Sequence, residues 1–539
     1  GGPRPVLPRE PAQQRAGGPS RNCDSPNRSY TPCVRRSVLL LIFVVTFVAA
    51  ACSDTGEAQP GSTDGTITSG DAAGTTITNP TTSTTTTTTL PDRPEGLVPG
   101  WTVGLPWGEV EGLLMFRGNP TRTYYGEGPV PQSPGVQWRF PDAPMCGNSP
   151  VGGEDKVWCG TGWTGQPLVW ERPDGITELI FGAYDKRLHF VDAATGERTR
   201  PDFSMGDIIK GTPTLDPDGY PLVYSGSRSS TFRIVAIDRA EPESLWGLEA
   251  SSVDGIWNND WDSNPAIVDD YMYLGGENSW FFIVKLNRSF GDDGLVTVDP
   301  KVVFSMPAWT EELRAAIGND QSVENSPAVF ENRVYFANSA GRIVGLDVSN
   351  IAAGEAEIVL DFWTGDDTDA TIVIDSGGML YVSSHQDHNT ARSAEVGHFM
   401  KLDPYRPDDP LVWSISLPGS GGVASGIWAT PALYGDIIYV PTNPGELIAV
   451  DTATGQIVWR DPIGTHAWSS PVVVDDTLVL AVGCESAPGI RAYDVANPRA
   501  PVELWELPRE AACIEATVTV WKGQMFVGSR DGYFYAFGD

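Results

Sequence analysis

Residues 448–462 read IAVDTATGQIVWRDP, and this stretch decides the fold. A short apolar strand ends at Asp451, a turn with Thr454 and Gly455 follows, and Trp459 lies in the next strand. The same pattern occurs eight times between residues 160 and 539, at spacings of 43 to 60 residues. Its anchor residues are Asp192, Asp238, Asn287, Asp347, Asp403, Asp451, Asp494 and Gly538. Repeats of this length build stacked or ring-like units that cannot bury a core singly.

Each repeat predicts four antiparallel strands. Its apolar runs are short, rich in Val, Ile, Tyr and Phe, and separated by polar turns, as in the hairpin PALYGDIIYVPT at residues 431–442. Four-stranded units arranged around an axis form a β-propeller, in which only short sheet edges are left open. We therefore expect an all-β protein that folds as an eight-bladed β-propeller of four-stranded antiparallel blades.

The last repeat ends at Asp539, before the strand that carries the Trp in the better copies. Residues 135–140, GVQWRF, form a Trp-containing strand that precedes the first repeat and has no place in it. Pairing this strand with the last hairpin would close the ring and tie down both ends of the domain. We expect a propeller over residues 135–539, closed by this N-terminal strand, and a lead-in segment over residues 96–134.

The N-terminal region predicts export. Residues 37–51 are an apolar run that follows Arg35 and Arg36, which is too short for a comfortable membrane span and typical of a signal sequence. The small residues before Cys52 fit a lipobox, so residues 1–51 are predicted to be a leader and Cys52 the lipidated residue. The alternative is an uncleaved membrane anchor. The first Met is Met115, so we expect residues 1–33 to precede the true start at Val34.

Residues 52–95 follow the lipidation site and end in a Thr-rich run. They contain too few apolar residues to offset the entropy of ordering, so we expect a disordered tether. The protein is thus predicted to be extracytoplasmic, anchored to the cell membrane as a lipoprotein, and monomeric.

The net charge limits the possible binding partners, and the number of cysteines predicts disulfides. The formal net charge is -33; residues 1–51 hold seven Arg and two acids, so the remainder carries -33 - 5 = -38. Such an acidic chain repels nucleic acid. Four cysteines follow Cys52, an even number that favours disulfides in an exported protein. We predict the pairs Cys146 with Cys159 and Cys484 with Cys513.

Candidate site residues come from the loops that lead into the innermost strands, because these loops gather at one mouth of a propeller's central channel. The candidates at this mouth are Lys210, Asp262, Glu324, Trp428, Trp468 and Glu515. They could hold a divalent cation through oxygen ligands, or a flat or sugar-like ligand against indole rings. The metal candidates are Asp262, Glu324 and Asn325, and His385, His388 and His398 offer a second set. The alternative is that these residues only cap strands and pack blades, and no catalytic residue is assigned.

The spacing of Ala449, Asp451, Thr454, Gly455 and Trp459 resembles the tryptophan-docking repeat of PQQ-like propellers, a family named after pyrroloquinoline quinone (PQQ). FRGNPTRT, residues 116–123, is similar to the lead-in segment of such proteins. The family includes quinoprotein dehydrogenases and the non-catalytic propeller lipoprotein of the β-barrel assembly machinery. The resemblance therefore implies either a binding or scaffolding module in the cell envelope or a PQQ- and calcium-dependent dehydrogenase.

We favour the binding module, with an envelope protein or a small ligand at the propeller face as its partner. The dehydrogenases resemble one another in an adjacent pair of cysteines that packs against the quinone, and this chain has no such pair. No cofactor is therefore firmly implied, although PQQ and calcium stay the alternative. A carbohydrate-binding or carbohydrate-cleaving propeller is the third hypothesis; cleavage would need two carboxyl groups about 5 to 10 Å apart.

Overall fold

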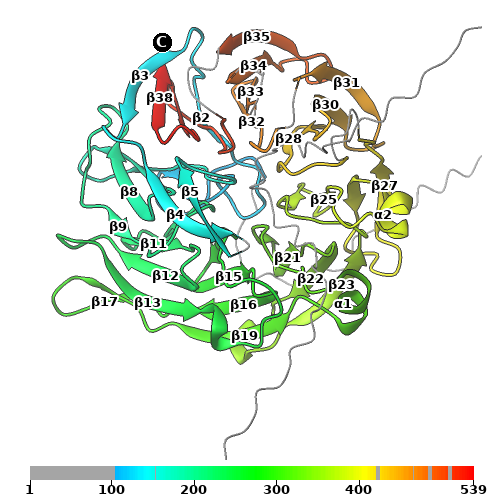
Figure 1. Ribbon diagram of the computed structural model, residues 1–539, viewed down its shortest axis with the longest axis horizontal. Helices are drawn as coiled ribbons and strands as arrows, with labels where there is room; N and C mark the ends of the chain where they lie inside the picture. Colours follow the sequence, from blue (N-terminus) through cyan, green and yellow to red (C-terminus); the bar gives the residue numbers. More distant parts are fainter. Residues whose placement is uncertain (1–102, 152, 420–424, 465–466, 483–488, 508–512) are drawn as a thin grey trace, which may run out of the picture. The chain divides into compact units, whose positions relative to one another are not determined.

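The computed structural model describes residues 103–539, apart from residues 152, 420–424, 465–466, 483–488 and 508–512. Eight antiparallel sheets follow one another in chain order around a central axis, with the fourth strand of each sheet at the rim (Figure 1). The prediction of an eight-bladed β-propeller is confirmed. Within the described part of the chain, no helix has both the length and the apolar character needed to cross a membrane.

The first four blades contain the following strands. Blade 1 is β6 (Leu168–Glu171), β7 (Thr177–Gly182), β8 (Arg187–Asp192) and β9 (Phe203–Ser204). Blade 2 is β10 (Thr214–Leu215), β11 (Leu222–Ser225), β12 (Thr231–Ala236) and β13 (Glu243–Glu249). Blade 3 is β14 (Ala266–Val268), β15 (Tyr271–Gly276), β16 (Trp280–Lys285) and β19 (Lys301–Pro307). Blade 4 is β20 (Ala328–Phe330), β21 (Arg333–Ala337), β22 (Arg342–Asp347) and β23 (Glu357–Trp363).

The remaining blades follow the same plan. Blade 5 is β24 (Val373–Ile374), β25 (Leu380–Ser383), β26 (Phe399–Leu402) and β27 (Leu411–Ile415). Blade 6 is β28 (Ala432–Tyr434), β29 (Ile437–Pro441), β30 (Glu446–Asp451) and β31 (Ile457–Pro462). Blade 7 is β32 (Val472–Val474), β33 (Thr477–Ala481), β34 (Ile490–Asp494) and β35 (Val502–Leu507). Blade 8 is β36 (Thr519–Trp521), β37 (Gln524–Gly528), β38 (Phe534–Gly538) and β3 (Gly135–Phe140).

Short elements decorate the ring. They are the hairpins β4 (Cys146–Val151) with β5 (Glu154–Cys159) and β17 (Ser289–Phe290) with β18 (Val296–Thr297), the α-helices α1 (Glu311–Ile317) and α2 (Ala391–Val396), and the 3-10 helices η1 (Ala250–Ser252) and η2 (Ile351–Ala353).

The repeat motif joins neighbouring blades. In blade 6, one Asp451 carboxylate oxygen accepts hydrogen bonds from the backbone N–H of Ala453 and Thr454 and from the Thr454 hydroxyl, which fixes the turn. Gly455 in this turn has φ +72°, and a Cβ there would lie 2.7 Å from the indole of Trp413 in blade 5. The Trp413 indole N–H also donates to the Thr452 carbonyl. Gly455 therefore leaves room for the Trp of the preceding blade, and Gly196 does the same for Trp138 of blade 8.

The N-terminal strand β3 closes the ring, as the sequence predicts. It pairs antiparallel with β38, from Gly135 opposite Gly538 to Phe140 opposite Phe534. At this seam, Phe534 of blade 8 stacks on Phe181 of blade 1 with ring centroids 4.0 Å apart. Phe281 of blade 3 and Phe336 of blade 4 stack in the same way at 4.1 Å. The closing seam thus has the packing of an ordinary seam between blades.

The lead-in segment fills the axis of the ring, where Figure 1 shows the blue part of the chain. Its strand β1 (Gly112–Leu113) pairs with β6 of blade 1, and its strand β2 (Gly126–Glu127) pairs in parallel with β36 of blade 8. Between these strands, Arg117 and Arg122 are fully buried. We call residues 112–127 the axial plug.

Arginine side chains fasten the axial plug to the innermost strands. Arg117 donates to the carbonyls of Pro431 and Pro471, and Arg122 donates to the carbonyl of Pro327 and to the Asn264 side chain. Burial, followed by repulsion from Arg117, lowers the pKa of Arg122 to about 9, so this guanidinium stays charged at neutral pH. Backbone carbonyls, which are partial negative charges, therefore replace the hydration that both cations lose.

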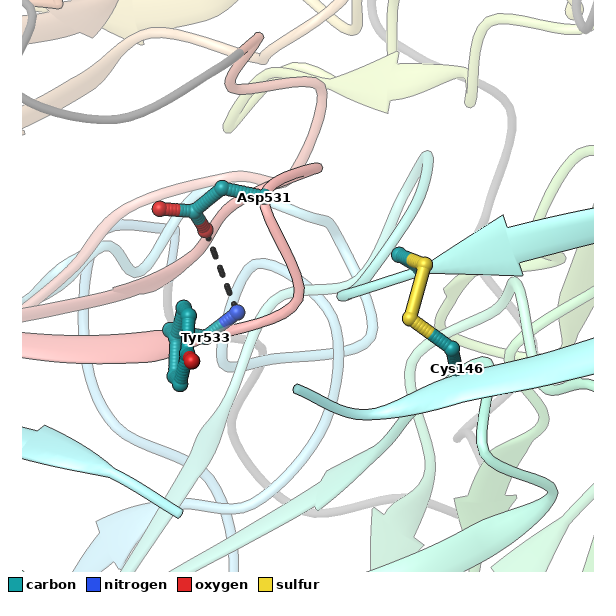
Figure 2. Close-up of a disulfide and its surroundings, with 4 residues drawn as sticks. Cys146, Asp531 and Tyr533 are labelled. Carbon is teal, nitrogen blue, oxygen red and sulfur yellow. Dashed lines mark hydrogen bonds between the residues drawn. A yellow bond between two sulfur atoms is a disulfide. The ribbon is translucent and has the colours of Figure 1, made fainter. Parts of the chain in front are cut away.

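The hairpin β4–β5 carries the predicted disulfide between Cys146 and Cys159 (Figure 2). Its base is attached to blade 8, because Met145 N–H donates to the Gly532 carbonyl. Figure 2 labels Asp531 and Tyr533, the sequence neighbours of Gly532. Cys513 is also disulfide-bonded. Its predicted partner Cys484 lies outside the described residues, so that pairing stays a prediction, as do the leader, Cys52 and the tether.

Candidate functional site

The candidate site is the mouth of the ring directly above the axial plug. The carbonyls that Arg117 and Arg122 bind belong to Pro327, Pro431 and Pro471. These prolines come three residues after Glu324, Trp428 and Trp468, which are predicted mouth residues. The axial plug therefore forms the floor of the mouth.

The structure brings Lys210, Asp262 and Glu324 together at the mouth, with Glu277 as a fourth member. Carboxylate oxygens of Asp262, Glu277 and Glu324 lie within 4.8 Å of one another, and all three residues are buried. The Lys210 ammonium pairs with Asp262 and lies 3.2 Å from a Glu277 oxygen. We call these four residues the lysine cluster.

Burial and mutual repulsion set the protonation of the lysine cluster. Burial lowers the pKa of Lys210, but Asp262 and Glu277 outweigh burial and hold that pKa above its ordinary value. Burial raises the pKa of Asp262 and of Glu324, and the neighbouring carboxylates add to both shifts. Three buried acids beside one ammonium cannot all be ionised, so the cluster retains protons at neutral pH.

A second acidic group lies on the next blades. Asp367 and Asp369 precede strand β24, and His385 follows strand β25. One ligand atom from each lies within 4.8 Å of the others, and all three residues are buried. Burial raises the pKa of Asp367 well above its usual range and that of Asp369 to about 6, whereas burial lowers the pKa of His385 well below its usual range. We call this the histidine cluster.

Trp428 and Trp468, both half-buried, lie beside the histidine cluster. Their ring centroids are 4.8 Å apart, and the Trp428 ring meets the His385 imidazole edge-on at 4.7 Å. The two indoles therefore give the mouth an apolar wall next to its carboxylates, as the sequence hypothesis of an aromatic ligand surface requires.

Glu515 lies apart from the other predicted carboxylates. It pairs with Arg530 at 2.9 Å, and Arg530 in turn stacks over Tyr184 at 4.7 Å and Trp158 at 5.4 Å. Trp158 belongs to β5, so the disulfide hairpin covers this side of the mouth. Burial raises the pKa of Glu515 although Arg530 opposes this shift.

Asn325, the remaining metal candidate, uses both ends of its amide to join blades. Its Nδ2 donates to the Thr368 carbonyl at 3.5 Å, and its Oδ1 accepts from the Ala337 N–H at 3.2 Å. His388 and His398 also have hydrogen bonds, to the Ser339 carbonyl and to the Ser425 hydroxyl respectively.

Four further residues belong to the mouth, although the sequence pattern did not single them out: Glu277, Arg228, Tyr184 and Arg530. All four come from loops between the second and third strands of their blades. Arg228 pairs there with Asp260, which comes two residues before the mouth residue Asp262. The signal was present, because these loops open on the same face as the loops that lead into each blade. Aligning the residues just after the second strand of each repeat would have produced a second set of candidate mouth residues.

Removing the cation of the lysine cluster should make stability depend on pH. With Lys210→Met, Asp262 and Glu277 lose the cation that lowers the pKa of each, so both pKa values rise in the folded protein and the variant loses stability as the pH rises above the unfolded values near 4. We expect its deficit in urea unfolding to be larger at pH 8 than at pH 5 by about 1 kcal/mol or more, since one pKa unit corresponds to about 1.4 kcal/mol. An equal deficit at both pH values would contradict the ion pairing.

Comparisons with known proteins agree with the repeat analysis. Residues 400–537 match the family model described as outer membrane protein assembly factor BamB. No curated protein matches the chain significantly. Among solved structures, quinohemoprotein alcohol dehydrogenase ADHIIG from Pseudomonas putida HK5 is 11% identical, with a TM-score of 0.53, covering 79% of this chain and 80% of that chain.

Two further structures extend the comparison. Quinohemoprotein alcohol dehydrogenase from Comamonas testosteroni is 12% identical, with a TM-score of 0.52 and the same coverage of 79% and 80%. BamB from Moraxella catarrhalis is 12% identical, with a TM-score of 0.36, covering 76% of this chain and 100% of that chain.

The repeats and the ring define the class of this protein as an eight-bladed β-propeller. The family model adds that its repeats are PQQ-like over residues 400–537, which confirms the resemblance found in the sequence. The similarity to the dehydrogenases, at 11% and 12% identity, shows a shared fold and carries no chemistry with it.

The lysine cluster does not fit the calcium ion that the alternative of a PQQ- and calcium-dependent dehydrogenase would require. A calcium site needs several free oxygen ligands. Here the Lys210 ammonium contacts Asp262 and Glu277, and the amide of Asn325 is used between blades. The Lys210 ammonium thus occupies the place beside Asp262 and Glu277 that a calcium ion would need.

Proposed function

We propose that this protein is an exported, lipid-anchored PQQ-like propeller that acts as a binding or scaffolding module in the cell envelope. The observation that carries the proposal is the set of side chains at the mouth: buried carboxylates next to two half-buried indoles, held above the axial plug. Such a preorganised set favours binding, because its side chains lose little entropy when a ligand or partner docks.

The charge of the mouth supports a cationic partner group. Its described carboxylates outnumber its described cations, and each of the cations is already paired with an acid of the mouth. A protein side chain or small ligand with positive charge would therefore be attracted, whereas a polyanion would be repelled.

The anchoring part of the proposal predicts the behaviour of Cys52→Ala. The full chain, expressed in a bacterium, should incorporate labelled palmitate, and Cys52→Ala should not. Ser53→Ala, which leaves Cys52 in place, is the matched control and should incorporate the label. Absence of the label from the full chain would mean that the leader is an uncleaved anchor.

The binding part is tested against redox catalysis with the same purified full chain in detergent. It should show no saturable uptake of PQQ with Ca²⁺ by absorbance and calorimetry, and no oxidation of alcohols with a dye acceptor. Saturable binding with turnover would overturn the binding-module proposal in favour of a quinoprotein dehydrogenase.

A further inference from the structure

The histidine cluster differs from the lysine cluster in one decisive respect. The lysine cluster contains its own cation, whereas no described Lys or Arg pairs with Asp367 or Asp369. Buried carboxyl groups are stable when they are protonated or when a cation compensates their charge, and a bound metal ion is one such cation. The two clusters are therefore equally buried but unequally compensated.

Buried carboxylate oxygens without hydrogen-bond partners also indicate that this cluster lacks a cation of its own. Asp367 Oδ1 is buried without a hydrogen-bond partner among the described residues, and so is Glu324 Oε2, whose carboxyl lies near Asp369. The other Asp367 oxygen lies 3.4 Å from His385 Nε2, and one Asp369 oxygen accepts from the Ser339 hydroxyl at 3.2 Å. Lone pairs thus converge where few donors are present.

Backbone hydrogen bonds hold His385 next to Asp367. His385 N–H donates to the Asp367 carbonyl at 2.9 Å, so the two residues that face each other are also joined through the main chain. The Asp366 carboxylate accepts from the N–H groups of Asp387, His388 and Asn389, which fixes the loop after His385. The cluster is therefore built before any ion arrives.

We propose that Asp367, Asp369 and His385 form a binding site for one divalent transition-metal ion of the Zn²⁺ type. Two carboxylate oxygens and one imidazole nitrogen suit Zn²⁺ or Mn²⁺, whereas Ca²⁺ and Mg²⁺ prefer oxygen ligands alone. Three protein ligands leave at least one coordination position for water or a bound ligand. The site goes beyond the proposed binding function and does not depend on it.

The test is metal binding by the full chain, purified in detergent, stripped with EDTA and with its thiols alkylated, because free thiolates also bind Zn²⁺. Calorimetry with Zn²⁺ should show one site per chain with micromolar or tighter affinity, and Ca²⁺ should bind far more weakly. Co²⁺ should bind at the same site and give d–d absorption bands. Absence of any site tighter than millimolar for Zn²⁺ and Mn²⁺ would overturn the proposal.

Matched variants locate the ion. Asp369→Asn and His385→Gln should each weaken Zn²⁺ binding about 100-fold, since loss of a direct ligand should cost at least the 10- to 100-fold that outer-shell changes cost. Asp262→Asn in the lysine cluster and His398→Gln should leave the affinity within about threefold. Near-UV circular dichroism and thermal melting check that each variant is folded. Equal affinity in Asp369→Asn and Asp262→Asn, both folded, would place the ion elsewhere and overturn the assignment.

Discussion

Replacing Arg122 with Met is expected to lower the free energy of unfolding of the full chain by about 3 to 5 kcal/mol. The guanidinium binds the carbonyls of Phe116 and Pro327 and the side chain of Asn264, all inside the ring. Each buried acceptor left without a donor costs about 1 to 3 kcal/mol, and Met, although similar in length, offers none. Urea unfolding followed by tryptophan fluorescence measures the loss.

Arg406→Met is the control for this prediction. The Arg406 side chain is 53% exposed, lies 3.7 Å or more from the carboxylates of Asp403 and Asp409, and donates, among the described residues, only to the Asp409 backbone carbonyl, so its replacement should change stability by about 0.5 kcal/mol or less. Limited proteolysis should in addition cut the axial plug faster in Arg122→Met than in the wild type. Equal stability of the two variants would show that the axial plug does not hold the blades together.

Phe534→Ala should cost about 3 to 5 kcal/mol, the usual loss for a buried Phe truncated to Ala. Phe534 is fully buried and stacks on Phe181 at 4.0 Å across the seam between blades 8 and 1. Truncation removes this stack and leaves a cavity where the two ends of the propeller meet. Urea unfolding is again the measurement.

Phe281→Ala provides the matched comparison, because Phe281 makes the same stack with Phe336 between blades 3 and 4 at 4.1 Å. The two losses should agree within about 1 kcal/mol, the range expected for one chemical change in similar sites. A large loss for Phe281→Ala with little loss for Phe534→Ala would mean that the ring is open at the closing seam in solution.

The fold could be predicted from the sequence because every blade is built from the same kind of short-range contacts. Asp451, Thr454 and Gly455 form their turn through short-range contacts, and the Gly is required by the Trp of the neighbouring blade. The strand over residues 135–140 could be assigned because the last repeat lacked one. The pair Cys146 with Cys159 followed from the even number of cysteines and from the loop geometry.

The site was predicted less well, because its residues are far apart in the sequence and come together only when the ring has formed. Lys210, Asp262 and Glu324 could be placed in one circle from the repeat register, but Glu277 and His385 come from a different set of loops. The axial plug was identified only as a lead-in segment. Its arginines bind backbone carbonyls in blades 4, 6 and 7, and such contacts leave no pattern in the residues that supply the carbonyls.

The axial plug and the closing strand also determine when this protein can finish folding. Arg117 bonds to a carbonyl 354 residues further along the chain, and Gln132 bonds to Asp539, 407 residues away. Contacts between such distant residues form slowly, because much chain entropy is lost before they stabilise anything. As synthesis proceeds from the N-terminus, the axial plug and β3 must wait for the last hairpin. A nascent chain therefore exposes unpaired strand edges until its final residues emerge, and its folding should be slow.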